Sequence, residues 1–154
     1  MRLYLATACL ALCGNALAAD EIGDVTEVVN FYGNCAGVWD FHADLQAAEG
    51  KPASAEQLRN MGNGAQTAAL WLLANKHSLD TGKATTYGSW DDLVRPRREN
   101  GKLRMHALAE QQDFETIKAE SQACLDAAEA QEKVLQMMRE DRVRQAQNDN
   151  KNPG

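Results

Sequence analysis

The sequence predicts an all-α protein: a small up-down bundle of three to four helices with one disulfide. Apolar residues recur at spacings of three and four over most of the chain, which is typical of amphipathic helices. No segment alternates with the period of two that strands require, and isoleucine occurs only at positions 22 and 117. A leader at the start of the chain would export the two cysteines that follow it, Cys35 and Cys124, to an oxidising compartment.

Residues 1–19 have the pattern of a secretory signal peptide. Arg2 precedes an apolar run that ends at Leu12, and small residues follow it. This run is shorter than the roughly 20 apolar residues of a transmembrane helix. A lipid anchor is disfavoured because Cys9 comes too early and Cys13 follows a bulky leucine. We therefore expect a periplasmic or secreted protein with no integral membrane segment once the leader is removed.

Residues 20–146 are expected to form one helical domain. The whole chain has a net charge of −6, which argues against nucleic-acid binding because that depends on a basic excess. The acidic balance is equally unfavourable for an anionic membrane surface. Since two cysteines remain and form no Cys-x-x-Cys motif, we expect Cys35 and Cys124 to pair. Closing so long a loop removes roughly 4 to 5 kcal/mol of unfolded-chain entropy.

The first predicted helix runs from Val25 to near Gly50, with Cys35 on its apolar stripe. Gly33 and Gly37 lie one turn apart on a neighbouring line. Each glycine inside a helix costs about 1 kcal/mol relative to alanine, so something should offset the loss. We expect a second helix packed very close to this line.

The second predicted helix starts at Ser54 with a capping-box pattern and ends near His77. Gly64 and Ala68 form another patch of small residues, so the first and second helices are expected to pack backbone to backbone. The alternative is a kink at residues 61–64 that opens a ligand pocket.

Residues 78–101 break the helical pattern and contain several turn signals. Within them we expect only a short helix over 90–94, because the residue before Pro96 is disfavoured in helical geometry. Such a long irregular stretch is a common place for functional residues.

A long helical pattern follows from Leu103 to residue 146. As a single helix it would be about 67 Å long, so we expect a break near Gln112 or Asp113. The last helix should then extend beyond its neighbours, and the polar residues 147–154 are expected to form a disordered tail.

Motifs for catalysis or metal binding are not found. His42 lies between Asp40 and Asp44, but residues two apart on a helix point in different directions. The chain has no zinc-type spacing, no Gly-x-Ser-x-Gly elbow and no phosphate-binding glycine loop. We therefore expect no metal, no cofactor and no enzymatic activity. Noncovalent haem held by His106 and Met61 is an alternative, as is a hydrolase with an unrecognised site.

Two surfaces are candidates for binding a partner. The first is a basic cluster that could hold carboxylates or phosphates, although its charges could instead balance nearby acids in a solvated turn. The second is the extended end of the last helix, whose apolar residues could form a groove, a self-associating segment or simply part of the core. The cluster consists of Trp90, Arg95, Arg97, Arg98, Lys102 and Arg104, and the helix offers Leu135 and Met138.

The sequence thus favours an exported, non-enzymatic helical protein that binds another protein, as an inhibitor, an immunity factor or an assembly accessory. Self-association through the last helix is a further option for the partner. The main alternative is a carrier that holds a small ligand or a cofactor such as haem in the bundle interior.

Overall fold

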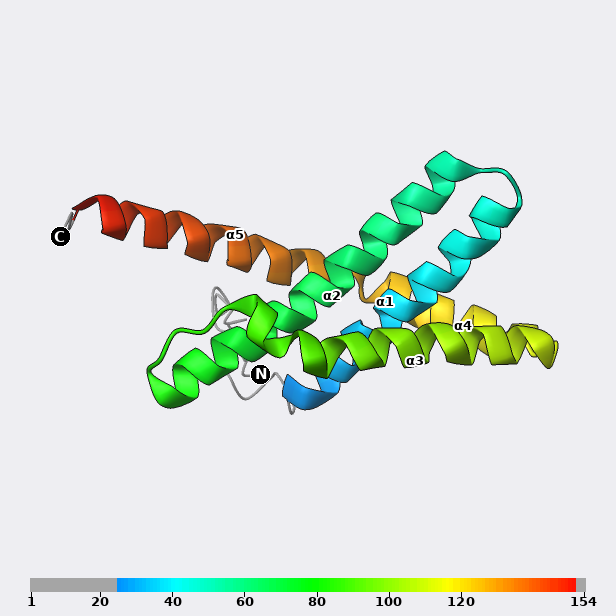
Figure 1. The fold of residues 1–154 in the computed structure, drawn as a ribbon, viewed down its shortest axis with the longest axis horizontal. Helices are drawn as coiled ribbons and strands as arrows, with labels where there is room; N and C mark the ends of the chain where they lie inside the picture. Colours follow the sequence, from blue (N-terminus) through cyan, green and yellow to red (C-terminus); the bar gives the residue numbers. More distant parts are fainter. Residues whose placement is uncertain (1–24, 152–154) are drawn as a thin grey trace, which may run out of the picture.

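The computed structural model describes residues 25–151, which form helices joined by short connections (Figure 1). A 3-10 turn, η1 (Tyr87–Trp90), leads into the third of five helices. The helices are α1 (Val25–Ala48), α2 (Pro52–Thr81), α3 (Asp91–Glu110), α4 (Phe114–Asp126) and α5 (Ala128–Lys151). Because a single residue separates α4 from α5, the chain forms four helical rods packed as a bundle, which confirms the predicted fold class. The expected signal peptide, residues 1–19, lies outside the described residues.

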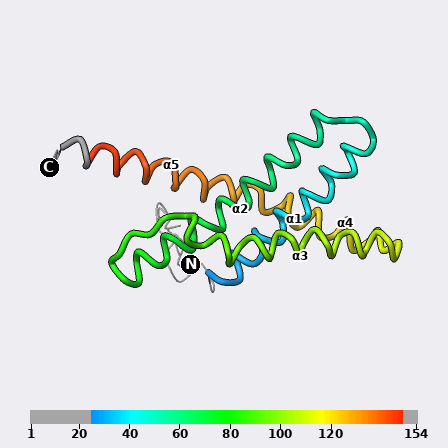
Figure 2. The backbone as a smooth tube through the Cα atoms, in the orientation of Figure 1, coloured from blue at the N-terminus to red at the C-terminus, as the bar shows by residue number. Residues whose placement is uncertain are grey.

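The chain reverses direction from each rod to the next, as Figure 2 traces. Helices α1 and α2 form an antiparallel pair, and α3 and α4 pack obliquely across α1. Helix α5 continues from α4 and projects beyond the rest of the bundle, as the long last pattern predicted (Figure 1). None of the helices in residues 25–151 combines the length and apolar character needed to cross a membrane.

The buried apolar residues form two clusters, and α1 contributes to both of them. The first joins α1, α2, α3 and α5, and consists of Val29, Tyr32, Ala68, Ala69, Trp71, Leu72, Val94, Val134, Leu135 and Met138. The second surrounds the disulfide and consists of Cys35, Ala36, Val38, Trp39, Phe41, Ala65, Met105 and Cys124. Helix α1 is therefore the central element of the fold.

The disulfide between Cys35 and Cys124 is present, as predicted, and ties α1 to α4. Cys124 is the fully buried residue of α4, whose other side chains are partly or wholly exposed. The covalent bond is therefore a principal attachment of α4 to the bundle.

The glycines of α1 pack against a close helix, as expected, but that helix is α3 and not α2. A Cβ added at Gly33 would lie 2.8 Å from the Cβ of Arg97, and one added at Gly37 would lie 2.9 Å from the carbonyl carbon of Gly101. A Cβ at Gly101 would in turn lie 2.6 Å from the backbone oxygen of Asn34. The backbones of α1 and α3 thus touch where neither helix carries a side chain.

The prediction that residues 78–101 break the helical pattern is correct for residues 82–90 and wrong at both ends of the range. Helix α2 continues to Thr81, where Gly82 ends it in the left-handed conformation (φ 67°) and donates its N–H to the Ser78 carbonyl. Helix α3 begins at Asp91 and passes through Pro96. Proline removes one backbone hydrogen bond and crowds the preceding turn. The close packing of α3 on α1 outweighs that local cost.

Other helix boundaries agree only in part with the sequence. The expected break falls at Gln112, which has a positive φ of 59°, and Asp113 caps α4 by accepting a hydrogen bond from Thr116 N–H at 3.1 Å. Helix α2 begins with Pro52 at its first turn rather than with a cap at Ser54. Helix α5 extends to Lys151, so residues 147–151 of the expected disordered tail are helical.

Candidate functional site

The predicted basic cluster is an internal network rather than one free patch. At its centre, Arg98 binds the carboxylate of Asp40 with two hydrogen bonds of 2.6 and 2.7 Å. It also donates to Asn63 at 3.0 Å and to Gln66, both on α2. The side chains of Arg98 and Asp40 are each only 18% exposed. Arg98 therefore connects α3 to α1 and α2.

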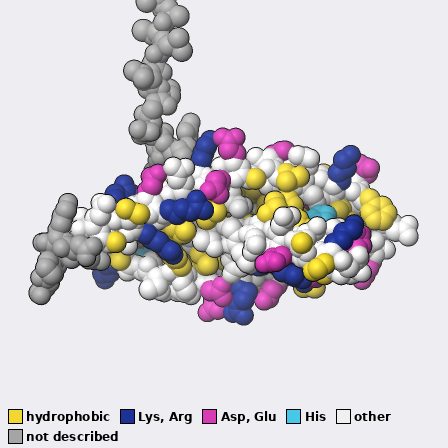
Figure 3. All heavy atoms as spheres, turned by 90° about the horizontal axis from the view of Figure 1, so that it is seen from above, with side chains coloured by type: hydrophobic (Ala, Val, Ile, Leu, Met, Phe, Trp, Pro, Cys, Tyr) yellow, Lys and Arg dark blue, Asp and Glu magenta, His cyan; other side chains and the backbone are white. Residues whose placement is uncertain are grey.

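The other members of the cluster also have partners within the chain. Arg95 binds two carboxylates of its own helix, Asp91 and Asp92, as the solvated-turn alternative anticipated. The remaining basic residues reach across to other helices, in the pairs Arg97 with Asn30, Lys102 with Asp44, and Arg104 with Glu120. Figure 3 shows basic and acidic side chains interleaved over the face in view. Binding of a partner by these residues stays a prediction, and such a partner would compete with existing ion pairs.

The aromatic and apolar candidates lie largely inside the fold. Trp90 packs against the ring of His77 on α2, with 5.4 Å between ring centroids. Leu135 and Met138 are 9% and 8% exposed and belong to the core cluster that joins α5 to the bundle. Both residues therefore pack in the core, and their binding of a partner stays a prediction. Val143 remains exposed further along the helix.

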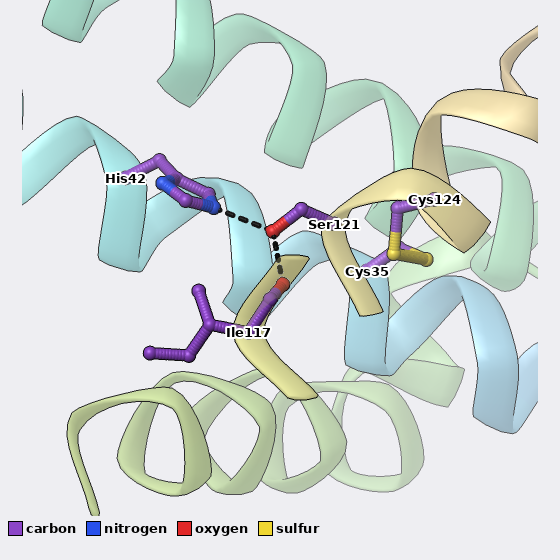
Figure 4. The surroundings of a disulfide bond; sticks show 5 residues. All are labelled: Cys35, His42, Ile117, Ser121 and Cys124. Carbon is purple, nitrogen blue, oxygen red and sulfur yellow. Dashed lines mark hydrogen bonds between the residues drawn. A yellow bond between two sulfur atoms is a disulfide. The ribbon is translucent and has the colours of Figure 1, made fainter. Parts of the chain in front are cut away.

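A histidine–serine pair lies beside the disulfide (Figure 4). His42 Nε2 is 2.7 Å from Ser121 Oγ, and the Ser121 hydroxyl donates its hydrogen to the Ile117 carbonyl at 2.7 Å. Because that hydrogen is already engaged, His42 acts as the donor and Ser121 as the acceptor. Burial lowers the pKa of His42, which favours the neutral ring. The pair is therefore arranged as a structural contact and not as a nucleophile with its base.

Within the described part of the chain, no three His, Cys, Asp or Glu side chains are grouped so that they could hold a metal ion.

A polar cleft lies between α2, the connection that follows it, and α5. Its volume is about 350 Å³. The α2 wall carries Trp71, Asn75 and Ser78, the connection carries residues 84–87, and the α5 wall carries Asp141, Arg142 and Gln145. Sequence reasoning missed this site. The one available signal was Tyr87 in a stretch expected to be irregular, since the α5 residues join the cleft only through the fold.

The guanidinium of Arg142 lies over the ring of Tyr87, 5.3 Å from its centroid. This cation–π contact holds the charge without consuming its N–H groups. Asp141, the carboxylate of the cleft, interacts with Arg144 at 3.4 Å and accepts a hydrogen bond from Gln145 at 3.0 Å. The cleft therefore contains a positioned cation beside a carboxylate whose charge is compensated.

A second hollow of about 320 Å³ lies at the start of α1, against Ala127. It is lined mainly by apolar groups of Val28, Phe31 and Tyr32, with Glu27 at its edge. This hollow can therefore make apolar contacts, but it has fewer polar groups for hydrogen bonding than the cleft has.

Similarity to known proteins assigns no role to either hollow. No protein-family model matches the chain, and neither a curated protein nor a solved structure matches it. The chemistry of the polar cleft follows from its own residues. A guanidinium with free N–H groups, hydroxyl and amide groups, and two aromatic rings can bind an oxygen anion together with a flat or apolar group.

Proposed function

We propose that the protein is an exported, non-enzymatic binding protein that captures another protein through the cleft between α2, residues 84–87 and α5. The observation that carries this proposal is Arg142, held over Tyr87 beside the cleft with no ion-pair partner among residues 25–148. The leader pattern supports export, and the disulfide is consistent with an oxidising compartment.

The groups that line the cleft are suited to recognition. Asn75, Ser78 and Gln145 offer amide and hydroxyl groups that orient a bound molecule. Asp141, the carboxylate of the cleft, is already held by Arg144 and Gln145. A lining of this kind favours binding.

The exposed end of α5 beside the cleft suits a macromolecular partner. A stable interface between proteins covers about 800 Å² on each side, so such a partner would also bind surface outside the cleft. The projecting end of α5, exposed over residues 142–148, extends the available surface next to the cleft. A partner could therefore insert one segment into the cleft and lie along α5.

Site-specific photo-crosslinking in the native compartment tests this proposal. The full chain is expressed in its own host with a photoreactive amino acid at Gln145 or at Thr86, which lie on two different walls of the cleft. The control places the same group at Leu103, which is 65% exposed on α3 and does not line the cleft. We expect both cleft positions to yield one shared protein adduct that the control lacks. Identical products from all three positions, or none from the cleft positions, would contradict the proposal.

A small-ligand carrier is the second candidate, because about 350 Å³ is within the usual size of a small-molecule site. Such a carrier would use this cleft rather than the bundle interior, where the backbones of Gly37 and Gly101 already meet. Native mass spectrometry of the protein purified from its host separates the two functions. A carrier would keep a bound small molecule, whereas the proposed function requires an empty cleft that fills with a protein segment.

A further inference from the structure

We infer that the cleft recognises a carboxylate presented by an acidic polypeptide segment, with Arg142 as the residue that binds it. This inference rests on the proposed function and names the chemistry of its site. It depends on three features of the structure: the unused hydrogen-bonding capacity of Arg142, the way Tyr87 holds it, and the groups around it.

Arg142 differs from every other arginine in the described part of the chain. Each of the others interacts with a polar side chain, in the pairs Arg59 with Asp44, Arg95 with Asp91, Arg97 with Asn30, Arg98 with Asp40, Arg104 with Glu120, Arg139 with Glu132 and Arg144 with Asp141. Arg142 has no such partner, and its contact is with the face of an aromatic ring. In an acidic chain where other arginines meet carboxylates or amides, this one is free to bind an external anion.

Tyr87 positions the guanidinium for that task. The ring attracts the cation and limits the freedom of a long side chain, which lowers the entropy lost on binding. The five N–H donors of arginine form a planar fork that matches the two oxygens of a carboxylate. A partly ordered fork with free donors is the arrangement that carboxylate recognition needs.

The surrounding groups favour a carboxylate over a phosphate. Arg142 is the one unpaired cation among the described residues that line the cleft, so it matches the single charge of a carboxylate but leaves part of the charge of a phosphate group unmatched. Lys76, on the same helix as Asn75, interacts with Asp80 at 2.8 Å. Asn75 and Ser78 can hydrogen-bond to a peptide backbone.

The apolar part of the cleft favours a polypeptide over a free small acid. Trp71, Ala74 and Ala84 line the cleft together with the polar residues. They provide apolar contact for the residues that flank an acidic side chain in a polypeptide. A small acid such as acetate would use only the polar groups.

Solution NMR with defined probes tests the inference on the mature protein. The probes are an acetylated and amidated Ala-Trp-Glu-Trp-Ala peptide, the same peptide with glutamine in place of glutamate, and acetate. We expect the glutamate peptide to shift the Arg142 Nε–Hε and Trp71 indole resonances, with a dissociation constant on the order of 1 mM for so short a ligand. The glutamine peptide should bind at least tenfold more weakly, and added salt should weaken the glutamate peptide further.

Two variants test whether Arg142 causes the preference for the glutamate peptide. Arg142→Gln should abolish the difference between the glutamate and glutamine peptides. Arg139→Gln, on the same helix but paired with Glu132, should preserve it. Thermal unfolding and the NMR spectrum of each variant without peptide check that its fold is intact. Equal binding of the two peptides to the wild type, or an unchanged preference in Arg142→Gln, would overturn the inference.

The remaining outcomes separate this inference from the proposed function. Acetate that shifts the same resonances as strongly as the glutamate peptide would assign the site to free carboxylic acids and overturn the polypeptide source. A crosslinked partner that still binds Arg142→Gln with full affinity would leave the proposed function standing and overturn carboxylate recognition. Selective binding of the glutamate peptide without any crosslinked protein would support the carboxylate site and contradict the proposed function.

Discussion

Gly37 of α1 and Gly101 of α3 lie back to back, and a Cβ placed on Gly37 would be 2.9 Å from the carbonyl carbon of Gly101. Real Cβ atoms do not approach backbone so closely. This contact lets α1 and α3 pack at a distance that ordinary side chains would prevent. It also explains why α1 has a glycine at position 37 despite the poor helix propensity of this residue.

Gly37→Ala should therefore destabilise the protein, because the new methyl group meets backbone that cannot rotate away. Overpacking of this kind costs about 3 kcal/mol, and the better helix propensity of alanine offsets about 1 kcal/mol of it. We expect a net loss of about 2 kcal/mol in the free energy of unfolding, measured by urea denaturation. Gly64→Ala is the matched control on α2. Its nearest contact is the end of the flexible Gln131 side chain at 3.0 Å, so it should be neutral or stabilising. Equal destabilisation by both substitutions would contradict the role given to the α1–α3 contact.

Removing the carboxylate of Asp40 should leave the charge of Arg98 without its main partner. Loss of one member of a buried ion pair costs 3–5 kcal/mol, but these side chains are 18% exposed and Arg98 keeps its contacts with α2. We expect Asp40→Asn to lower the free energy of unfolding by about 2 kcal/mol. The comparison is Arg95→Gln, which breaks ion pairs in which Arg95 is 56% exposed and should therefore destabilise the protein much less than Asp40→Asn does. If urea denaturation showed a larger loss of stability for Arg95→Gln than for Asp40→Asn, the central role given to the Arg98–Asp40 pair would be contradicted.

Reduction of the disulfide should weaken the attachment of α4. Cys35 and Cys124 are 89 residues apart, and opening a loop of that size restores about 4 to 5 kcal/mol of unfolded-chain entropy in the simple model. We expect dithiothreitol to lower the melting temperature, and the amide hydrogens of α4 to lose protection from exchange before those of α1. Cys35→Ala with Cys124→Ala is the second measurement and should behave like the reduced protein. A melting temperature that does not change when mass spectrometry shows both thiols reduced would contradict this prediction.

Features that depend on local pattern could be predicted from the sequence. Amphipathic spacing indicated α1 and α2, and the pairing of Cys35 with Cys124 followed from the even number of cysteines left beyond the expected leader. The break before α4 was also predictable, because Asp113 is a favourable N-cap and a longer single helix is rare.

Features that depend on the packing of one helix against another could not be predicted from the sequence. Pro96 indicated a helix end by a local rule, but contacts of α3 with α1 are non-local and override it. The apolar spacing at Leu135 and Met138 predicts a covered helix face, but it does not specify whether the core or a partner covers that face.

The candidate site was hidden for the same reason. The basic cluster was visible in sequence, but its compensating carboxylates Asp40, Asp44 and Glu120 lie on other helices. The sequence carries no signal for Arg142, because its position over Tyr87 arises only when α5 packs beside the connection after α2. An unpaired arginine can be recognised only once the partners of the others are known.

His42 should make the stability of the fold fall at mildly acidic pH. Burial lowers the pKa of its imidazole below the ordinary 6.5, so the unfolded chain binds a proton at a pH where the folded protein does not. Stability then decreases as the pH drops below about 6.5 and continues to decrease down to the folded-state pKa, with a slope of at most about 1.4 kcal/mol per pH unit. His42→Gln, which keeps a side-chain donor for Ser121 but cannot titrate, should show a smaller decrease between pH 6.5 and 5. Urea denaturation at several pH values gives the two slopes, and an identical slope for His42→Gln and the wild type would show that other groups cause the dependence.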